Sequence, residues 1–392
     1  MVVVTVLTLG VAGAASMFMA WSIGAGSSGS TPFAPAVGAN AISVMRAGLI
    51  VGVLGLMGAV LQGANVTEAV GTELIGGVTL TAGAAIVALV TAAGLVALGV
   101  FAGYPIATAF TVTGAVVGVG LAMGGDPAWP KYREILSLWV LTPFVGGGIA
   151  YVVARSLIGE RLSERPLTAA LAGLVGAIVA NVGFALLGPP GEQASLSEAV
   201  GPELGVGAVG TPLVTVAVAT VVTAAVYLDL GRDREGAQRR FLLAMGGLVA
   251  FSAGGSQVGL AIGPLVPLFV GDAGIPLWAL LVGGGVGLLA GSWTGAPRMI
   301  KAISQDYASM GPRRSISALI PSFAIAQTAV AFGIPVSFNE IIVSAIVGAG
   351  YAAGDAGVSR AKMGYTVFAW IGSLVGSLAL GYGIYSAVQF VL

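Results

Sequence analysis

Long apolar stretches dominate this chain and limit what it can fold into. Each is close to the length of about 20 residues that a helix needs to cross a bilayer. Only 8% of the 392 residues are charged and 57% are hydrophobic, whereas a soluble domain carries about 25% charged residues. A lipid-spanning β-barrel would show short alternating segments instead. We therefore expect an all-α integral membrane protein, multi-pass in the cell membrane. The stretches fall near 2–21, 44–63, 78–102, 105–123, 135–154, 166–188, 211–228, 241–253, 275–296, 315–333, 335–352 and 363–391.

The residue types that are absent narrow the chemistry. The sequence contains neither cysteine nor histidine, which removes disulfides, thiol chemistry, Cys/His zinc sites and histidine acid–base catalysis. The sequence also lacks the paired aspartates or the Ser/Lys arrangement that would indicate an intramembrane enzyme. The net charge is zero, so nothing indicates binding to nucleic acid. We expect no enzymatic activity and no cofactor.

Loop charges predict how the chain crosses the membrane. Basic residues gather in four loops, at 155–165, 232–240, 298–314 and 360–362. By the positive-inside rule these loops face the cytoplasm. The segments 68–73 and 192–203 contain acids and no bases, so we place them outside. Counting the predicted crossings from these loops toward each end of the chain places both termini outside.

Two pairs of similar segments share one offset. "PIATAFTVTGAVVGVG", which begins at Pro105, resembles "PVSFNEIIVSAIVGAG", which begins at Pro335. "WSIGAGS" contains Gly24 and resembles "FSAGGSQ", which contains Gly254. The offset in sequence number is the same for both pairs, since 335 − 105 and 254 − 24 both equal 230. Two unrelated matches would seldom share one register, so the pattern predicts an internal repeat.

The repeat divides the chain into three parts. We expect a first repeat over 1–154, a two-span insert with a cytoplasmic basic loop over 155–240, and a second repeat over 241–392. The basic loops give the two copies opposite orientations, because the stretch at 2–21 runs inward and that at 241–253 runs outward. Oppositely oriented repeats are an architecture of secondary transporters.

Each copy contains a stretch that is rich in glycine and polar residues, at 22–38 and at 252–268. Unpaired backbone cannot face lipid, because each bare amide costs several kcal/mol there. Interrupted apolar segments at matching positions of two halves indicate a transporter's binding site. We therefore expect both stretches to be unwound or re-entrant near the midplane. Helix N-termini there would suit an anion. The alternative is that these glycines only allow close helix packing.

The second repeated motif supports the same interpretation. "PIATAF" and "PVSFNE" each open an apolar helix with a proline and small polar residues. Proline suits the first helical turn, and a neighbouring Ser or Thr can cap the helix or contact a ligand. Both roles stay open for Thr108, and the ligand role is favoured for Ser337 and Asn339.

The motifs in the interrupted stretches resemble those of the inorganic phosphate transporter (PiT) family. The resemblance extends over essentially the whole chain. The family's second-half motif reads roughly F-A-H-G-A-N-D-V-A-N-A-I-G-P-L, and "FSAGGSQVGLAIGPL" aligns with it without a gap. The family's P-V-S-T-T-H element matches "PVSFNE" at Pro335, Val336 and Ser337. The first-half motif is looser and keeps Gly24 and Ala25.

The resemblance implies a symporter that moves phosphate with sodium or protons, or a related oxyanion such as sulfate. The family's cation-liganding Asp falls on Ser27 in the first half and on Gln257 in the second. Its final Thr and His fall on Asn339 and Glu340. Two neutral side chains hold a hard cation less firmly than carboxylates. This chain is therefore expected to be a divergent member, whose coupling ion, Na⁺ or H⁺, stays open.

Glu340 is one of few carboxylates inside an apolar run. An intramembrane ionisable residue is a functional candidate by default, and burial favours the protonated form of a carboxylate. We predict that Glu340 carries a co-transported proton or helps to bind a cation. The alternative is a position at a wet helix end.

These observations predict a set of site residues. The substrate-binding candidates are Ser27, Ser28, Thr31, Thr108, Ser256, Gln257, Ser337 and Asn339. The coupling-ion candidates are Gly24, Ser27, Gly254, Gln257 and Glu340. Sodium near Ser27 and Gln257 is one option for the cation. No catalytic residue is assigned.

The predicted function is cation-coupled symport of inorganic phosphate. The alternatives are a proton-coupled symporter of sulfate or another oxyanion, an anion channel, and a transceptor that binds without net transport. The predicted partners are the oxyanion and the lipid bilayer. A homodimer is compatible with the sequence, although no segment indicates one.

Overall fold

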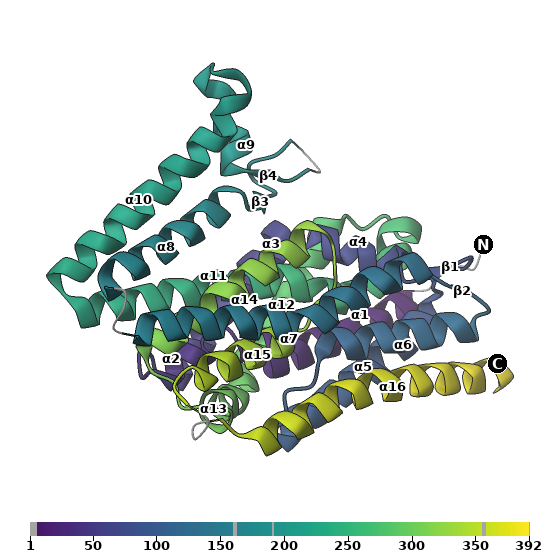
Figure 1. The fold of residues 1–392 in the computed structure, drawn as a ribbon. Helices are drawn as coiled ribbons and strands as arrows, with labels where there is room; N and C mark the ends of the chain where they lie inside the picture. The colour runs from purple at the N-terminus through teal and green to yellow at the C-terminus, as the bar shows by residue number, and fades with distance from the viewer. Residues whose placement is uncertain (1–5, 160–162, 190–191, 355–357, 392) are drawn as a thin grey trace.

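The computed structural model describes residues 6–159, 163–189, 192–354 and 358–391, and helices dominate it (Figure 1). The apolar residues predicted at 2–5 and the part of a basic loop at 160–162 lie outside the described ranges. The α-helices are α1 (Val6–Ile23), α2 (Ala34–Gly38), α3 (Val44–Gln62), α4 (Ala64–Thr72), α5 (Ala82–Ala102), α6 (Thr108–Ala122), α7 (Trp129–Ile158), α8 (Glu164–Ala180), α9 (Leu196–Val200), α10 (Gly210–Arg232), α11 (Arg234–Ile262), α12 (Leu277–Thr294), α13 (Ala296–Asp306), α14 (Pro312–Ala331), α15 (Phe338–Tyr351) and α16 (Arg360–Val391).

Short irregular elements connect the helices. Two antiparallel strand pairs are present, β1 (Ile75–Gly76) with β2 (Asp126–Pro127), and β3 (Gly183–Phe184) with β4 (Ala194–Ser195). The π-helical turns are η1 (Gly24–Ser28) and η5 (Pro267–Asp272), and the 3-10 turns are η2 (Pro202–Leu204), η3 (Gly207–Val209) and η4 (Gly263–Leu265).

Eight helices of the described chain are long and apolar enough to cross a membrane. They are α1 with its π-helical extension, α3, α5, α7, α10, α11, α12 and α16. Two further apolar helices, α6 and α15, have only 15 and 14 residues. At 1.5 Å per residue each is about 20 Å long, shorter than the hydrocarbon core of about 30 Å. The prediction of an all-α, multi-pass membrane protein is confirmed.

The helices lie side by side in one bundle, and α8 and α10 form an arm that projects from it (Figure 1). Helix α1 begins and helix α16 ends at the same end of the bundle. That arrangement agrees with termini on one side of the membrane.

Helix boundaries recur with the offset found in the sequence. Helix α5 begins at Ala82 and α14 at Pro312, while α6 begins at Thr108 and α15 at Phe338. Both pairs of starts reproduce that offset, and the starts of α7 and α16 deviate from it by a single position. The opposite orientation of the two copies stays a prediction.

Long and short helices of the two predicted copies pack through glycine. An ideal Cβ placed on Gly118 of α6 would collide with the Leu378 carbonyl oxygen of α16. A Cβ on Gly348 of α15 would likewise collide with the Gly147 carbonyl oxygen of α7. Gly118 and Gly348 are equivalent residues of the repeated motif. Because small residues let helix backbones approach closely in membranes, these positions bring each short helix against a long helix of the other copy.

The two interrupted stretches differ from each other. Over 22–38 the predicted interruption is confined to the turn at 29–33, because α1 continues into the π-helical turn η1 and α2 begins at Ala34. The prediction of unwinding over 252–262 is wrong, because α11 continues unbroken to Ile262 and the interruption begins at Gly263. The glycines are tolerated in α11 because they meet neighbouring backbone. A Cβ on Gly254 would collide with the Gly55 carbonyl oxygen of α3.

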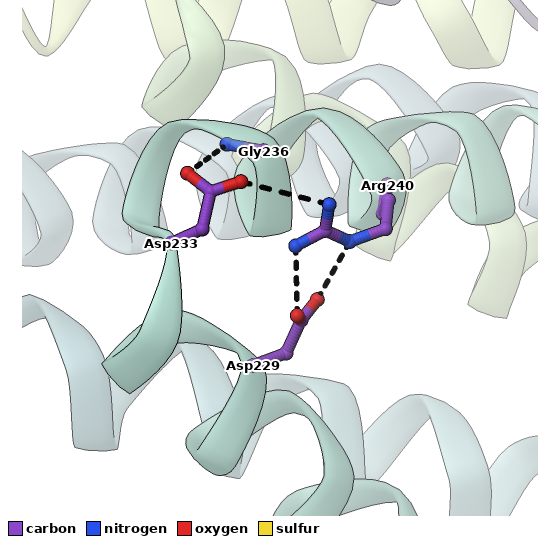
Figure 2. A network of polar contacts seen from close by, with 4 residues as sticks. All are labelled: Asp229, Asp233, Gly236 and Arg240. Atoms are coloured by element: carbon purple, nitrogen blue, oxygen red, sulfur yellow. Dashed lines mark hydrogen bonds and ion pairs between the residues drawn. The ribbon is translucent and has the colours of Figure 1, made fainter.

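A polar network fixes the turn between the arm and α11. The Arg240 guanidinium donates to both carboxylate oxygens of Asp229, at 2.9 and 2.7 Å (Figure 2). Asp233 caps α11 by accepting from the Gly236 amide at 3.0 Å. Arg240 also lies 3.7 Å from the Asp233 carboxylate. The basic segment predicted as a loop between two spans is therefore mostly helical, with only Asp233 between α10 and α11.

Candidate functional site

Three polar side chains from three separate elements meet in the middle of the bundle. Thr108, the first residue of α6, donates its hydroxyl to Gln257 Oε1 of α11 at 2.7 Å. Ser27 of η1 donates to the same oxygen at 3.3 Å, and its Oγ lies 3.4 Å from Thr108 Oγ1. All three side chains are fully buried. The π-helical break of α1 therefore lies against an intact turn of α11, and the contact joins equivalent positions of the predicted repeat.

The segment before α15 closes this cluster from another side. Gln257 Nε2 donates to the Val336 carbonyl at 2.6 Å. Asn339 Nδ2 donates to the Gly26 carbonyl at 2.9 Å and to the Ile106 carbonyl at 2.7 Å. Both amide side chains thus bind backbone carbonyls of the irregular segments around the cluster.

The N-termini of α6 and α15 both lie at the cluster. Thr108 begins α6, and Asn339 is the second residue of α15. The bond from Asn339 to Ile106 joins the two ends directly. Helix N-termini carry partial positive charge and unpaired amide groups. Two such ends at one buried point form an environment that favours an anion.

Several buried oxygen atoms around the cluster have no hydrogen-bond partner within the described chain. They are Ser28 Oγ, Ser256 Oγ, Asn339 Oδ1 and Glu340 Oε2. More than about nine tenths of buried polar groups in proteins are paired, so four such atoms on neighbouring residues of the cluster are unusual. Such unpaired atoms are able to bind a polar ligand that enters beside the cluster.

Two further predicted residues, Thr31 and Ser337, have local roles, and Ser30 assists Thr31. Thr31 Oγ1 and Ser30 Oγ donate back to the Ser27 carbonyl at 3.0 and 3.2 Å, which stabilises the break. Ser337 caps α15, its Oγ 3.5 Å from the Glu340 amide. Thr108 makes no such cap, because the N-cap position of α6 is Ala107. The ligand role of Thr31 and Ser337 stays a prediction.

The two glycines predicted as coupling-ion ligands pack against helices. A Cβ on Gly24 would collide with the Leu288 carbonyl oxygen, as one on Gly254 would with that of Gly55. Close packing thus explains both glycines, and ion contact through their carbonyls stays a prediction.

Charges are scarce at the cluster. None of the ion pairs between described residues includes Glu340, whose side chain is 2% exposed. No group of three or more Asp, Glu, His or Cys residues that could hold a metal occurs in the described ranges. A sodium ion here would depend on hydroxyl, amide and carbonyl oxygens, which suit it chemically but bind it less firmly than carboxylates do.

Two tryptophans attach the cluster to the long helices, and sequence reasoning missed both. Trp139 of α7 donates its indole N–H to the Pro335 carbonyl at 2.8 Å. Trp370 of α16 donates to the Pro105 carbonyl, also at 2.8 Å. The two prolines are equivalent in the predicted repeat, and each contact joins one predicted copy to the other. The one signal available in the sequence was the spacing of the two tryptophans, which matches the repeat offset to within a single position.

Known proteins resemble this chain along nearly its full length. The sequence matches the Phosphate transporter family over residues 6–381. A protein of Pyrococcus horikoshii described as "Putative phosphate permease" is 26% identical over 380 residues and covers 90% of each chain. A chloroplastic inorganic phosphate transporter of Arabidopsis thaliana is 23% identical over 398 residues, 90% of this chain and 68% of its own.

A solved structure shares the fold. It is described as "The sodium-dependent phosphate transporter" and superposes with a TM-score of 0.82 at 23% identity, covering 98% of this chain and all of its own. These comparisons confirm the resemblance inferred from the motifs. They also confirm the assignment to transporters rather than enzymes.

Proposed function

Because this chain belongs to the phosphate transporter family, we propose that it is a secondary transporter that carries inorganic phosphate across the cell membrane together with a cation. The observation that carries the proposal is the convergence of two helix N-termini, of α6 and α15, on one buried polar cluster. Phosphate is a tetrahedral oxyanion, and amide groups at helix ends bind such anions.

The side chains supply further donors to the anion. Ser27, Thr108 and Gln257 are linked to one another by hydrogen bonds of 2.7 to 3.4 Å. Ser28 and Ser256 add hydroxyls without partners in the described chain. A phosphate placed here would accept from these hydroxyls once the bonds between them rearrange. We assign substrate contact to this cluster together with Thr31, Ser337 and Asn339.

We infer a co-transported cation because the described part of the site has no positively charged side chain to compensate the charge of the phosphate. Among the described residues, no lysine or arginine forms a hydrogen bond or ion pair with the cluster, and an uncompensated charge is costly to bury. A co-transported cation would neutralise the phosphate during its passage. Glu340 is the carboxyl group next to Asn339, and one of its oxygens has no partner in the described chain. We assign the coupling ion to Glu340, to the oxygens of Ser27 and Gln257, and to the carbonyls of Gly24 and Gly254.

The same proposal covers the organisation of the chain. Residues 1–154 and 241–392 form the two inverted repeats, and 155–240 form an insert that contains the arm. The site lies where η1 of the first repeat meets α11 of the second. Symmetric halves around a central site are how secondary transporters expose a substrate alternately to the two sides.

Uptake into proteoliposomes tests the function. The purified protein is reconstituted, and labelled phosphate uptake is measured with a sodium gradient and a pH gradient imposed separately. We expect accumulation above the outside concentration with one of the two gradients and none without a gradient. Equilibration without accumulation would indicate a channel, and binding without uptake a transceptor. Competition by unlabelled sulfate stronger than by unlabelled phosphate would reject phosphate as the substrate.

A further inference from the structure

A cavity of about 660 Å³ with a mixed polar and apolar lining lies between the arm and the bundle. The ends of α3, α8 and α14 that surround it are all predicted to face outward. Its polar lining consists of Gln62, Asn65, Asn181, Gln193, Glu198, Thr215, Gln327 and Thr328. Among the described residues, no lysine or arginine lines it. The carboxylate of Glu198 is already engaged, because it accepts from the Ser195 amide and hydroxyl at 2.8 Å each.

A pair of amides closes the bottom of this cavity. Gln62 of α3 and Gln327 of α14 are 1% and 8% exposed, whereas Asn181 and Thr328 at the rim are exposed. Each glutamine Nε2 lies 3.3 Å from the other's Oε1, so the pair is reciprocal. Gln327 Nε2 also donates to Ser252 Oγ of α11 at 2.6 Å.

The amide pair adjoins the proposed phosphate site. Ser252 and Ser256 are one helical turn apart and share a face of α11. An ideal Cβ on Gly255, the residue before Ser256, would lie 2.8 Å from Gln62 Cβ. The hydroxyl of Ser256 is buried and has no partner in the described chain. The amide pair therefore lies between the cavity and the face of α11 that carries Ser252 and Ser256, and the same helix carries Gln257 of the cluster.

We propose that this cavity is the outward entrance of the path taken by phosphate, and that the Gln62–Gln327 pair is its inner gate. The inference rests on the proposed function. Amides and hydroxyls can donate to a phosphate oxygen, while the lack of bases keeps binding weak enough for the anion to move on. The pair is neutral, so it opens by exchanging hydrogen bonds and leaves no buried charge unpaired.

The protein contains no cysteine, so single cysteines report access directly. Ala324→Cys and Ala331→Cys place thiols at two positions along the cavity, since both residues line it. Leu204→Cys, 49% exposed in η2, serves as a control on the same predicted side but outside the cavity. A charged, membrane-impermeant thiosulfonate is added from outside, with and without phosphate in the presence of both candidate cations.

We expect all three thiols to react from outside. Phosphate at about ten times its dissociation constant should slow the two cavity positions about tenfold and leave Leu204→Cys unchanged. The proposal that the cavity is the entrance would be overturned if Leu204→Cys reacted while Ala324→Cys and Ala331→Cys did not. The entrance would also be overturned if phosphate did not slow the labelling of the two cavity positions in a protein whose phosphate uptake is intact. If sulfate slowed the labelling of the cavity positions and phosphate did not, the cavity would still be the entrance for an anion, but phosphate would be rejected as the substrate.

The gate has its own test. Ser252→Cys lies behind the glutamine pair and should react slowly from outside. Adding Gln62→Ala removes one half of the pair and should raise that rate several-fold, whereas adding Leu204→Ala should not. Equal rates for Ser252→Cys with and without Gln62→Ala would overturn the gate while leaving the entrance standing.

Discussion

At the scale of single residues, Thr108 is the side chain that links the cluster. Its hydroxyl contacts both Gln257 and Ser27. Thr108→Val keeps the shape and removes the hydroxyl, which costs about 1 kcal/mol per net hydrogen bond. We expect the KM for phosphate to rise roughly five- to tenfold, while Thr108→Ser retains most of the affinity. Initial uptake rates across a phosphate series would measure both. An unchanged KM for Thr108→Val would show that this hydroxyl does not contact substrate.

Glu340 is the residue on which coupling depends in the proposed function. Its carboxyl is buried in α15 without an ionic partner in the described chain. Glu340→Gln keeps the size and removes the carboxyl group that can bind and release a proton. We expect accumulation driven by a pH gradient to be lost, while exchange of phosphate for phosphate continues. Glu340→Asp should retain part of the pH-driven uptake. Full pH-driven accumulation by Glu340→Gln would exclude this carboxyl as the proton carrier.

At the scale of elements, the two indole contacts hold the starts of the short helices. Trp139→Phe and Trp370→Phe each remove one hydrogen bond to a proline carbonyl while retaining an aromatic ring. A buried carbonyl left unpaired costs about 1–3 kcal/mol. We expect each variant to raise the KM for phosphate several-fold, because the site residues of α6 and α15 lose their fixed position. Trp278→Phe, 65% exposed in α12, is the control. Lower thermal stability with an unchanged KM would indicate a structural role alone.

The glycine contacts between short and long helices give a second prediction at this scale. Gly348→Ala would place a Cβ against the Gly147 carbonyl oxygen, so α15 and α7 must separate. Overpacking of this kind typically costs about 1–3 kcal/mol. We expect a lower unfolding temperature in detergent. Gly372→Ala in α16 should have little effect, because nothing lies within 4 Å of its added Cβ. Equal stability of the two variants would contradict the packing described here.

The elements also show where sequence reasoning reached its limit. Apolar length located the spans, and the two residues that the repeat offset relates, Ser27 and Gln257, are hydrogen-bonded in the structure. Glycine content did not predict where α11 ends. Glycine weakens a helix in isolation, but Gly254 lies against the Gly55 carbonyl, and that contact is a property of the packed bundle. The Trp139 contact with Pro335 was equally hidden, because a partner so distant in the sequence leaves no local pattern.

At the scale of the whole molecule, the repeats and the site depend on how the chain crosses the bilayer. Glu203 lies in η2, predicted to be outside, and Lys301 in α13, predicted to be cytoplasmic; both side chains are exposed. The helices α10, α11 and α12 lie between them, and each is long and apolar enough to span. An odd number of crossings must place the two residues on opposite sides.

This prediction can be tested in intact cells. Glu203→Cys should react with an impermeant thiol reagent at once, and Lys301→Cys only after the membrane is made permeable, since the native chain offers no competing thiol. Reaction of both from outside would mean that one of the three helices does not cross. If α10 is the helix that does not cross, α1 and α11 would enter the membrane from the same side, and the predicted opposite orientation of the copies would be lost. The two helix N-termini that meet at the cluster would still lie together. The two copies, however, would not be inverted repeats, which is the architecture that gives alternating access in secondary transporters.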